Sequence, residues 1–225
     1  MSEERDIQLN RRKKMEQWLD SSQGYDNSFR REHSSKDLHI KYGARDKAEL
    51  ETLAESAAVC GRIMLKRAMG KASFISIQDF SGQIQCYLTK GKLGEDAYDQ
   101  FLALTDIGDI VGVRGLVMRT NKGELTVSAQ EVYLLNKTLQ PLPEKFHGLA
   151  DQEIRYRRRY LDLMMNRETR ERFTTRSRIL NRVREFFVGR DYLEVETPMM
   201  HPIPGGAAAR PFSTHHNALD MDLYL

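Results

Sequence analysis

The sequence predicts an α+β protein, mainly β, built around one small barrel with a helix before it and part of a second domain after it. Five short segments between residues 55 and 140 alternate apolar and polar side chains, as strands with one buried face do. Residues 3–20 instead repeat apolar side chains at helical spacing. Two prolines, Pro141 and Pro143, then stiffen the exit from the barrel. We therefore expect a helix and connector over residues 1–54, the barrel over 55–140 and an incomplete domain over 141–225.

The composition indicates a hydrated surface and no membrane partner. Of the 225 residues, 40% are hydrophobic and 30% are charged, and the mean hydropathy is −0.59. No segment approaches the roughly 18 apolar residues of a membrane span, and the N-terminus lacks the apolar run of a secretory signal. A cytoplasmic location is the expectation that follows.

The two cysteines, Cys60 and Cys86, stand alone within alternating segments. Neither belongs to a CxxC pair, and no histidine cluster lies nearby in the sequence. This pattern predicts reduced core cysteines and no metal site.

The expected strands follow the order of an OB-fold. A helical pattern with Ala97, Phe101 and Leu104 separates the third strand from the fourth, and glycines mark the turns at Ser81-Gly82 and Asn121-Lys122-Gly123. Three strands, a helix and two strands is the OB-fold order, although five short strands can also make another small barrel. The strands are expected at residues 57–66, 72–79, 83–89, 109–120 and 125–135.

One face of these strands carries the functional prediction. Alternation turns Ile75 and Ile77 inward, so Phe74 shares the polar face with Ser76 and Gln78. A ring among amides, hydroxyls and carboxylates is the combination that recognises single-stranded bases, by stacking and by hydrogen bonds. Packing of Phe74 against the N-terminal helix is an equally good explanation. The same alternation places these further residues outside: Gln83, Gln85, Tyr87, Glu124, Thr126 and Ser128.

Three groups of basic residues each allow two interpretations. The cations on and after the first strand would contact phosphates or form a solvated edge. The arginine-rich run from Arg155 to Arg190 is either an ion-paired helix face or a phosphate-facing surface. The third group is the basic turn of the N-terminal helix, and this helix could either pack or touch RNA. The first group is Arg62, Lys66, Arg67 and Lys71, and the basic turn is Arg11, Arg12, Lys13 and Lys14.

The last part of the chain begins with a long helix. Residues 168–188 place one apolar stripe along the helix, formed by Phe173, Leu180, Val183 and Phe187. A strand, YLEVETP, is expected next, with Leu193, Val195 and Thr197 inward and Pro198 ending the pairing. The small residues of PIPGGAAARPF then permit a close approach to substrate or to a neighbouring element, with a structural turn favoured by their chemistry alone.

Several long strings resemble the class II lysyl-tRNA synthetases of the bacterial type. They are MGKASF, PLPEKFHGL, RYRRRYLDL, EVETPMM, and PGGAAARPF followed by THHNALDMDLYL. EVETP and its preceding helix resemble motif 1 of class II synthetases, which forms the homodimer interface and ends in a proline, here Pro198. Aspartyl and asparaginyl enzymes share the barrel and motif 1, so KFHGL and PGGAAARPF are what favour lysine. Residues 141–225 would then begin an antiparallel α/β catalytic domain.

The resemblance also implies specific contacts. In this family the OB-fold binds the tRNA anticodon, and the matching positions here are Arg67, Phe74, Gln85 and Glu124. A loop beside the lysine pocket is matched by Gly205, Gly206 and Ala207.

The reaction implied by the resemblance is that of a lysine–tRNA ligase. Such an enzyme adenylates lysine with ATP and Mg²⁺ and passes the acyl group to tRNA, mainly by positioning and by stabilising phosphate charge. The arginines for this task belong to motifs 2 and 3, which do not occur before Leu225. We therefore expect no catalytic residue in this chain, and a truncation inside the alternating strand that ends at Leu225. The alternatives are a non-catalytic RNA-binding module and an aspartyl or asparaginyl synthetase.

Overall fold

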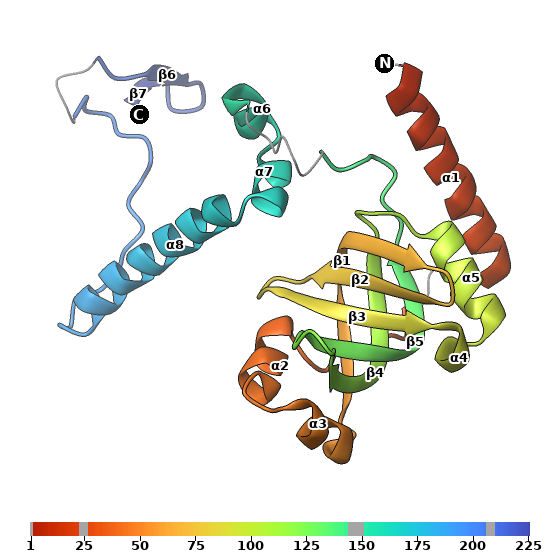
Figure 1. The fold of residues 1–225 in the computed structure, drawn as a ribbon. Coiled ribbons are helices and arrows are strands. Elements are labelled where there is room, and N and C mark those ends of the chain that lie inside the picture. The colour runs from red at the N-terminus through yellow and green to blue at the C-terminus, as the bar shows by residue number, and fades with distance from the viewer. Residues whose placement is uncertain (1, 23–26, 144–150, 206–209) are drawn as a thin grey trace. The chain divides into compact units, whose positions relative to one another are not determined.

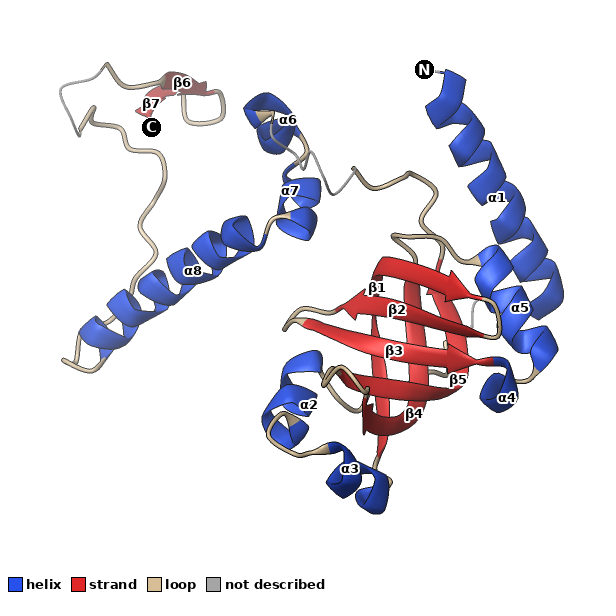
Figure 2. Cartoon of the chain, in the orientation of Figure 1, coloured by secondary structure: helices blue, strands red, loops and turns tan. Residues whose placement is uncertain are grey.

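The computed structural model describes residues 2–22, 27–143, 151–205 and 210–225. The chain forms two compact units, Met1–Phe146 and His147–Leu225. The first unit holds a closed β-barrel with helices around it, and the described residues of the second form three helices and a two-stranded sheet (Figures 1 and 2). Among the described helices, none combines the length and apolar character that a membrane span requires.

The barrel is an OB-fold, as predicted. Its strands close in the order β1-β2-β3-β5-β4, with β3 and β5 parallel and the other pairs antiparallel. Two helices, α4 (Lys90–Leu93) and α5 (Glu95–Leu104), connect β3 to β4. All five predicted strands are present, as β1 (Ser56–Met69), β2 (Ala72–Gln78), β3 (Gln83–Thr89), β4 (Ile110–Arg119) and β5 (Leu125–Asn136).

The barrel interior is apolar because alternate residues of each strand point into it. Ile75, Ile77 and Ile84 are at most 2% exposed, and Phe101 of α5 packs in the same core cluster. Cys86 lies in this core, where burial raises the pKa of its thiol, and Cys60 is half-buried. Both cysteines are free, as predicted, although only one of them belongs fully to the core.

Two glycines allow β4 and β5 to meet closely and turn tightly. A Cβ on Gly115 would lie 2.0 Å from the backbone oxygen of Ser128, so no larger residue fits beside β5 there. Gly123 has a φ of +84°, which favours glycine, and its N–H donates to the Thr120 carbonyl at 2.9 Å. The turn therefore places Glu124 directly before β5.

In the described part of the chain before the barrel there are three helices. Helix α1 (Ser2–Ser22) lies alongside α5 (Figure 1), and the Gln100 side chain of α5 donates to the Ser21 hydroxyl at 2.7 Å. Helices α2 (Ser35–Tyr42) and α3 (Lys47–Leu53) occupy much of the segment predicted as a connector. Each begins with a capping box, in which the N-cap and N3 side chains bond to each other's backbone N–H.

Part of the basic turn of α1 packs against the barrel. Arg11 is 9% exposed and donates to the backbone carbonyls of Ile107, Thr138 and Gln140. Lys14 pairs with Asp106 at 2.6 Å. These two residues hold α1 on the loop before β4 and on the segment after β5, so packing is the interpretation that applies to them.

The second unit contains α6 (Gln152–Arg157), α7 (Arg159–Met165) and the long helix α8 (Arg167–Val188), followed by β6 (Ser213–His216) and β7 (Met221–Tyr224). The predicted helix is therefore confirmed. The predicted strand over residues 192–198 is wrong, because that segment has no regular structure. Leu193 and Val195 are 89% and 72% exposed rather than inward. A strand needs a neighbour to pair with, and the described residues provide none beside this segment.

The arginine-rich run is largely ion-paired. Arg155 and Arg159 both donate to the fully buried carboxylate of Asp162, which also accepts from Asn166 and Thr169. Further pairs on or near α8 join arginines to glutamates, namely Arg157–Glu153, Arg167–Glu171, Arg172–Glu168, Arg182–Glu185 and Arg184–Glu194. For these arginines, the ion-paired helix face is the interpretation that the contacts support.

Candidate nucleic-acid interface

The outer face of the barrel carries a row of functional side chains across β1, β2, β3 and β5. Arg67 pairs in register with Phe74, Phe74 with Tyr87, and Tyr87 with Ser128. Directly paired residues lie on the same face of a sheet. The rings of Phe74 and Tyr87 have centroids 4.7 Å apart and an interplanar angle of 32°. An exposed guanidinium and two half-buried rings therefore follow one another on this face.

A second row lies one step along the strands. It consists of Ser76, Gln85 and Thr126, again joined by register. The hydroxyl of Thr126 donates to Oε1 of Gln85 at 2.9 Å. Gln85 is therefore held on the outer face beside the aromatic pair, with the rest of its amide free to meet a ligand.

Glu124 lies directly before β5. It is exposed, and its carbonyl accepts a hydrogen bond from the Thr126 hydroxyl at 3.1 Å. A third register pair, Gln78 and Gln83, continues the amide-rich surface, with Gln83 Nε2 donating to Gln78 Oε1 at 2.9 Å. The structure thus brings Arg67, Phe74 and Gln85 to one face, where stacking and hydrogen bonding groups are combined, and it places the exposed Glu124 two residues before Thr126.

Two cations of the first group are not available on this face. Arg62 donates to the Gly108 carbonyl at 2.6 Å and to the Thr138 hydroxyl. Lys66 donates to the carbonyls of Leu102 and Thr105 at the end of α5. Burial lowers the pKa of Lys66 to about 8, against the opposing attraction of Asp106. Neither phosphate contact nor a solvated edge describes these two residues.

The backbone explains this difference between neighbouring cations. The register of β1 shifts between Ile63 and Leu65, so Ile63 and Met64 are both buried. After the shift, Lys66 pairs with inward-pointing Ile75, and Arg67 pairs with Phe74. Lys66 is therefore directed toward α5, while Arg67 stays exposed on the outer face.

Thr126 and Ser128 lie on the predicted outer face but are not open surface. They are 0% and 2% exposed, because each is covered by a neighbouring side chain. Thr126 bonds to Gln85, and Ser128 accepts from Lys92 of α4 at 2.8 Å. They lie beneath Gln85 and Lys92 and bond to these side chains, so they contribute no open surface of their own.

Tyr87 is the residue that the sequence prediction did not select as a binding residue. Alternation had placed it on the outer face, but its partnership with Phe74 depends on strand register. A signal in the sequence could have revealed this partnership. Counting outward from the four-residue turn between β2 and β3 pairs Phe74 with Tyr87.

The predicted residues of the second unit are separated along an irregular segment. Pro198 and Gly205 are both exposed and lie outside helices and strands. Gly206 and Ala207 lie outside the described residues, as does the KFHGL string at residues 145–149.

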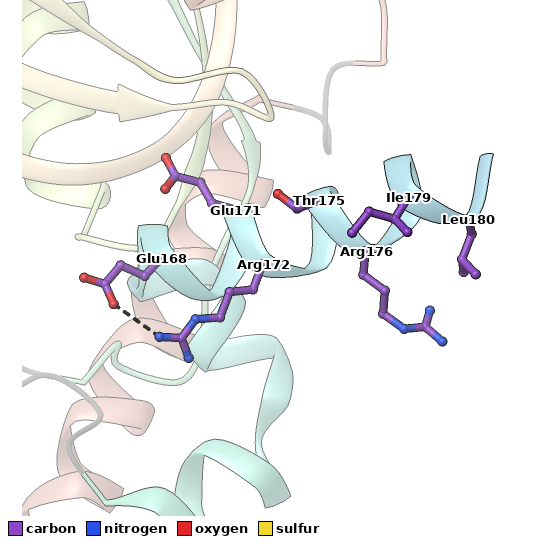
Figure 3. Close-up of a pocket in the computed structure, with 7 residues that line it drawn as sticks. All are labelled: Glu168, Glu171, Arg172, Thr175, Arg176, Ile179 and Leu180. Atoms are coloured by element: carbon purple, nitrogen blue, oxygen red, sulfur yellow. Dashed lines mark ion pairs between the residues drawn. The ribbon is translucent and has the colours of Figure 1, made fainter. Parts of the chain in front are cut away.

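A surface pocket lies along α8 (Figure 3). Glu168, Arg172 and Arg176 project from this helix near Ile179 and Leu180, and Arg172 pairs with Glu168 at 3.7 Å. All the residues that line this pocket come from the one helix, so it is an open face of α8. Among the described residues, no group of three or more His, Cys, Asp or Glu side chains is placed to hold a metal ion.

Two family models match parts of the chain. The OB-fold nucleic acid binding domain matches residues 57–135, which cover the barrel. The family described as tRNA synthetases class II (D, K and N) matches residues 151–225. Residues 151–225 are therefore similar to class II tRNA synthetases. The predicted similarity to lysine enzymes is confirmed by individual relatives.

The chain is 55% identical over 225 residues to a lysine–tRNA ligase of Laribacter hongkongensis. It is 53% identical to that of Chromobacterium violaceum and 52% identical to that of Burkholderia cenocepacia. Each alignment covers at least 99% of this chain and 44% of the relative. The chain therefore spans less than half the length of these curated relatives.

Proposed function

We propose that the barrel binds the anticodon loop of a tRNA through the outer face that carries Arg67, Phe74, Gln85 and Glu124. The observation that carries this proposal is the aromatic pair of Phe74 and Tyr87 on a polar face, 4.7 Å apart between centroids. Unpaired bases can stack on such rings, and the neighbouring amide and carboxylate supply hydrogen bonds that choose between bases.

Substitution of Phe74 tests this proposal. Phe74→Ala should weaken binding of an anticodon stem-loop to the full chain by about 1 to 3 kcal/mol, because one stacking surface is lost. Phe212→Ala is the matched control, since Phe212 is 82% exposed in the second unit and lies outside the barrel. Equal affinities of the Phe74 variant and the unaltered chain would assign Phe74 to packing alone.

The wider proposal is that this sequence serves in lysine–tRNA ligase activity. A longer protein of the relatives' length would attach lysine to its tRNA: ATP would activate the lysine carboxylate as its adenylate in the presence of Mg²⁺, releasing pyrophosphate, and the tRNA would then displace AMP. No described cluster of carboxylates fits a Mg²⁺ ion, so no step of that reaction is assigned to residues of this chain. The loop residues Gly205, Gly206 and Ala207 are proposed to lie beside the lysine in that protein.

We expect the 225-residue chain to bind RNA without catalysing adenylation. Lysine-dependent pyrophosphate exchange by this polypeptide measures adenylation directly, and clear turnover would refute the expectation. Competition among hairpins with the anticodons for lysine, aspartate and asparagine then separates the three related specificities. The lysine hairpin should compete best.

Dimerisation through motif 1 completes the proposal. The stripe of α8 formed by Phe173, Leu180, Val183 and Phe187 is 44% to 48% exposed, which is unusual for apolar side chains of this size on one helix face. The segment after α8 leads to Pro198, the position that matches the end of motif 1. A second copy of the chain is the proposed partner of this stripe.

A further inference from the structure

A lysine of α4 lies at the β5 end of the row that carries the aromatic pair. Helix α4 begins directly after β3, and the exposed Lys92 donates through Nζ to the Ser128 hydroxyl at 2.8 Å. Ser128 pairs in register with Tyr87, and Tyr87 pairs with Phe74. The ammonium group of Lys92 is therefore held over β5, at the position next to Tyr87 in this row.

The opposite end of the same row carries a second cation. Arg67 of β1 pairs in register with Phe74 and is exposed on the outer face. Because β1, β2, β3 and β5 are successive neighbours, the backbones of Arg67 and Ser128 are separated by three strand spacings, about 14 Å in a flat sheet and less in a curved one. The two rings therefore lie between two cations.

Lys92 keeps its charge available to a ligand, unlike its neighbour Lys90. Lys90 pairs with Glu95 at 2.9 Å and with Asp99 at 2.6 Å. In the described part of the chain no carboxylate pairs with Lys92, which bonds to a neutral hydroxyl instead. An ammonium group has three donors, so two of them remain for a ligand. Of these two lysines, Lys92 is the one that presents an uncompensated charge beside the rings.

A phosphate is the group that such a charge recognises at an RNA interface. Lysine binds phosphate as a compact point charge, and phosphate contacts fix the position of the bound strand. Each nucleotide within an RNA strand has one phosphate on its 5′ side and one on its 3′ side. A base that stacks between two cations can therefore have a cation for each of its phosphates. The alternative is a solvated lysine, which predicts no effect on RNA binding beyond a change in net charge.

We infer that Lys92 is a phosphate-binding residue, and that Lys92 and Arg67 hold the two phosphates that flank the base stacked on Phe74. This inference rests on the proposed function, since it extends the same interface from the barrel strands onto α4. The bound RNA strand then crosses β1, β2, β3 and β5 along the row, at a large angle to the direction of these strands.

The salt dependence of hairpin binding tests the role of Lys92. Fluorescence anisotropy gives the affinity of an anticodon stem-loop for the full chain at several salt concentrations. Lys92→Gln keeps a hydrogen bond donor and removes the charge, so it should reduce the slope of log affinity against log salt by about 0.7. Lys90→Gln is the matched control, because it changes the net charge equally on the same helix and should leave the slope unchanged. Lys92→Arg should retain the slope of the unaltered chain.

Single uncharged linkages in the RNA test whether the two phosphates flank one nucleotide. Each phosphate of the loop is replaced in turn by a methylphosphonate, which has no charge. The replacement that meets Lys92 should weaken binding to the unaltered chain about two- to fivefold, as loss of one exposed ion pair does, and should not weaken binding to Lys92→Gln. The replacement that meets Arg67 should lie on the other side of the same nucleotide, and its effect should disappear in Arg67→Ala.

Three results would overturn the inference while leaving the proposed function intact. They are an unchanged slope in Lys92→Gln, an equal reduction of the slope in Lys90→Gln, and sensitive linkages for Lys92 and Arg67 that do not flank one nucleotide. In each case the hairpin still binds the chain. Failure of the unaltered chain to bind any anticodon hairpin would instead refute the proposed function, and the inference with it.

Discussion

The rings of Phe74 and Tyr87 lie 4.7 Å apart between centroids on adjacent strands, with their planes inclined by 32°. Neighbouring rings in this geometry stabilise each other by about 0.5 to 1.5 kcal/mol beyond their buried area. Tyr87 therefore supports Phe74 at the position proposed for base stacking.

A double-mutant cycle measures this coupling. We predict that Phe74→Ala and Tyr87→Ala, measured by urea unfolding singly and together, have a coupling free energy of about 0.5 to 1.5 kcal/mol. Tyr87→Phe is the control, because it keeps the ring and removes only the hydroxyl. Additive effects of the two alanine substitutions would mean that the rings do not support each other.

Two arginines of β1 should differ in their effect on RNA binding. Arg67→Ala should reduce the slope of log affinity against log salt by about 0.7, the effect of one lost phosphate contact with single-stranded RNA. Arg62→Ala should leave this slope unchanged, because the Arg62 guanidinium already donates to the Gly108 carbonyl. Titrations of an anticodon hairpin at several salt concentrations give both slopes. The reverse result would place the RNA on a different side of β1.

The pKa of Lys66 predicts a specific dependence of stability on pH. Burial lowers it to about 8 in the folded chain, against 10.5 for an ordinary lysine. Between these values the unfolded chain binds more protons than the folded chain, so this residue's contribution to stability rises with pH. Below about pH 8 both states are protonated, and the contribution no longer changes.

Lys66→Met should remove that rise. Unfolding free energies of both chains at pH 7.5 and pH 9.5 isolate the lysine, because other titrating groups are common to the two. The unaltered chain should gain stability relative to the variant on going to pH 9.5. A constant difference between the chains would show that Lys66 titrates near its ordinary pKa.

The apolar stripe of α8 predicts the oligomeric state. Leu180 lies at the middle of this stripe, and Leu180→Asp should place a charge in the proposed contact between two copies. Arg178 is on the opposite side of the helix at 100° per residue, so Arg178→Asp is the matched control. Sedimentation velocity should show a dimer for the unaltered chain and the control, and a monomer for Leu180→Asp. A monomeric unaltered chain would contradict the proposed interface.

Much of the barrel could be predicted from local patterns. Alternation of Ile75 and Ile77 with Phe74 and Ser76 identifies both faces of β2, because side chains in a strand alternate strictly. The same rule places Thr126 and Ser128 on the correct face, but it does not show that Gln85 and Lys92 cover them. Alternation reports direction, whereas burial also depends on what packs above.

The direction of Lys66 depends on more distant features. The irregularity after Ile63 reverses the alternation of β1, and no residue type marks it in the sequence. The carbonyls of Leu102 and Thr105 come within reach of Lys66 only after α5 has packed onto the barrel. The strand predicted over residues 192–198 is absent for a related reason, because an alternating segment forms a strand only beside a partner strand.

Photo-cross-linking tests the location of the RNA most directly. An anticodon hairpin with 4-thiouridine at successive loop positions is bound to the full chain and irradiated, and the linked peptides are identified by mass spectrometry. We predict cross-links to β2 and β3, at Phe74, Gln85 or Tyr87. Cross-links confined to α1 or to the arginine-rich run over residues 155–190 would contradict the proposed interface.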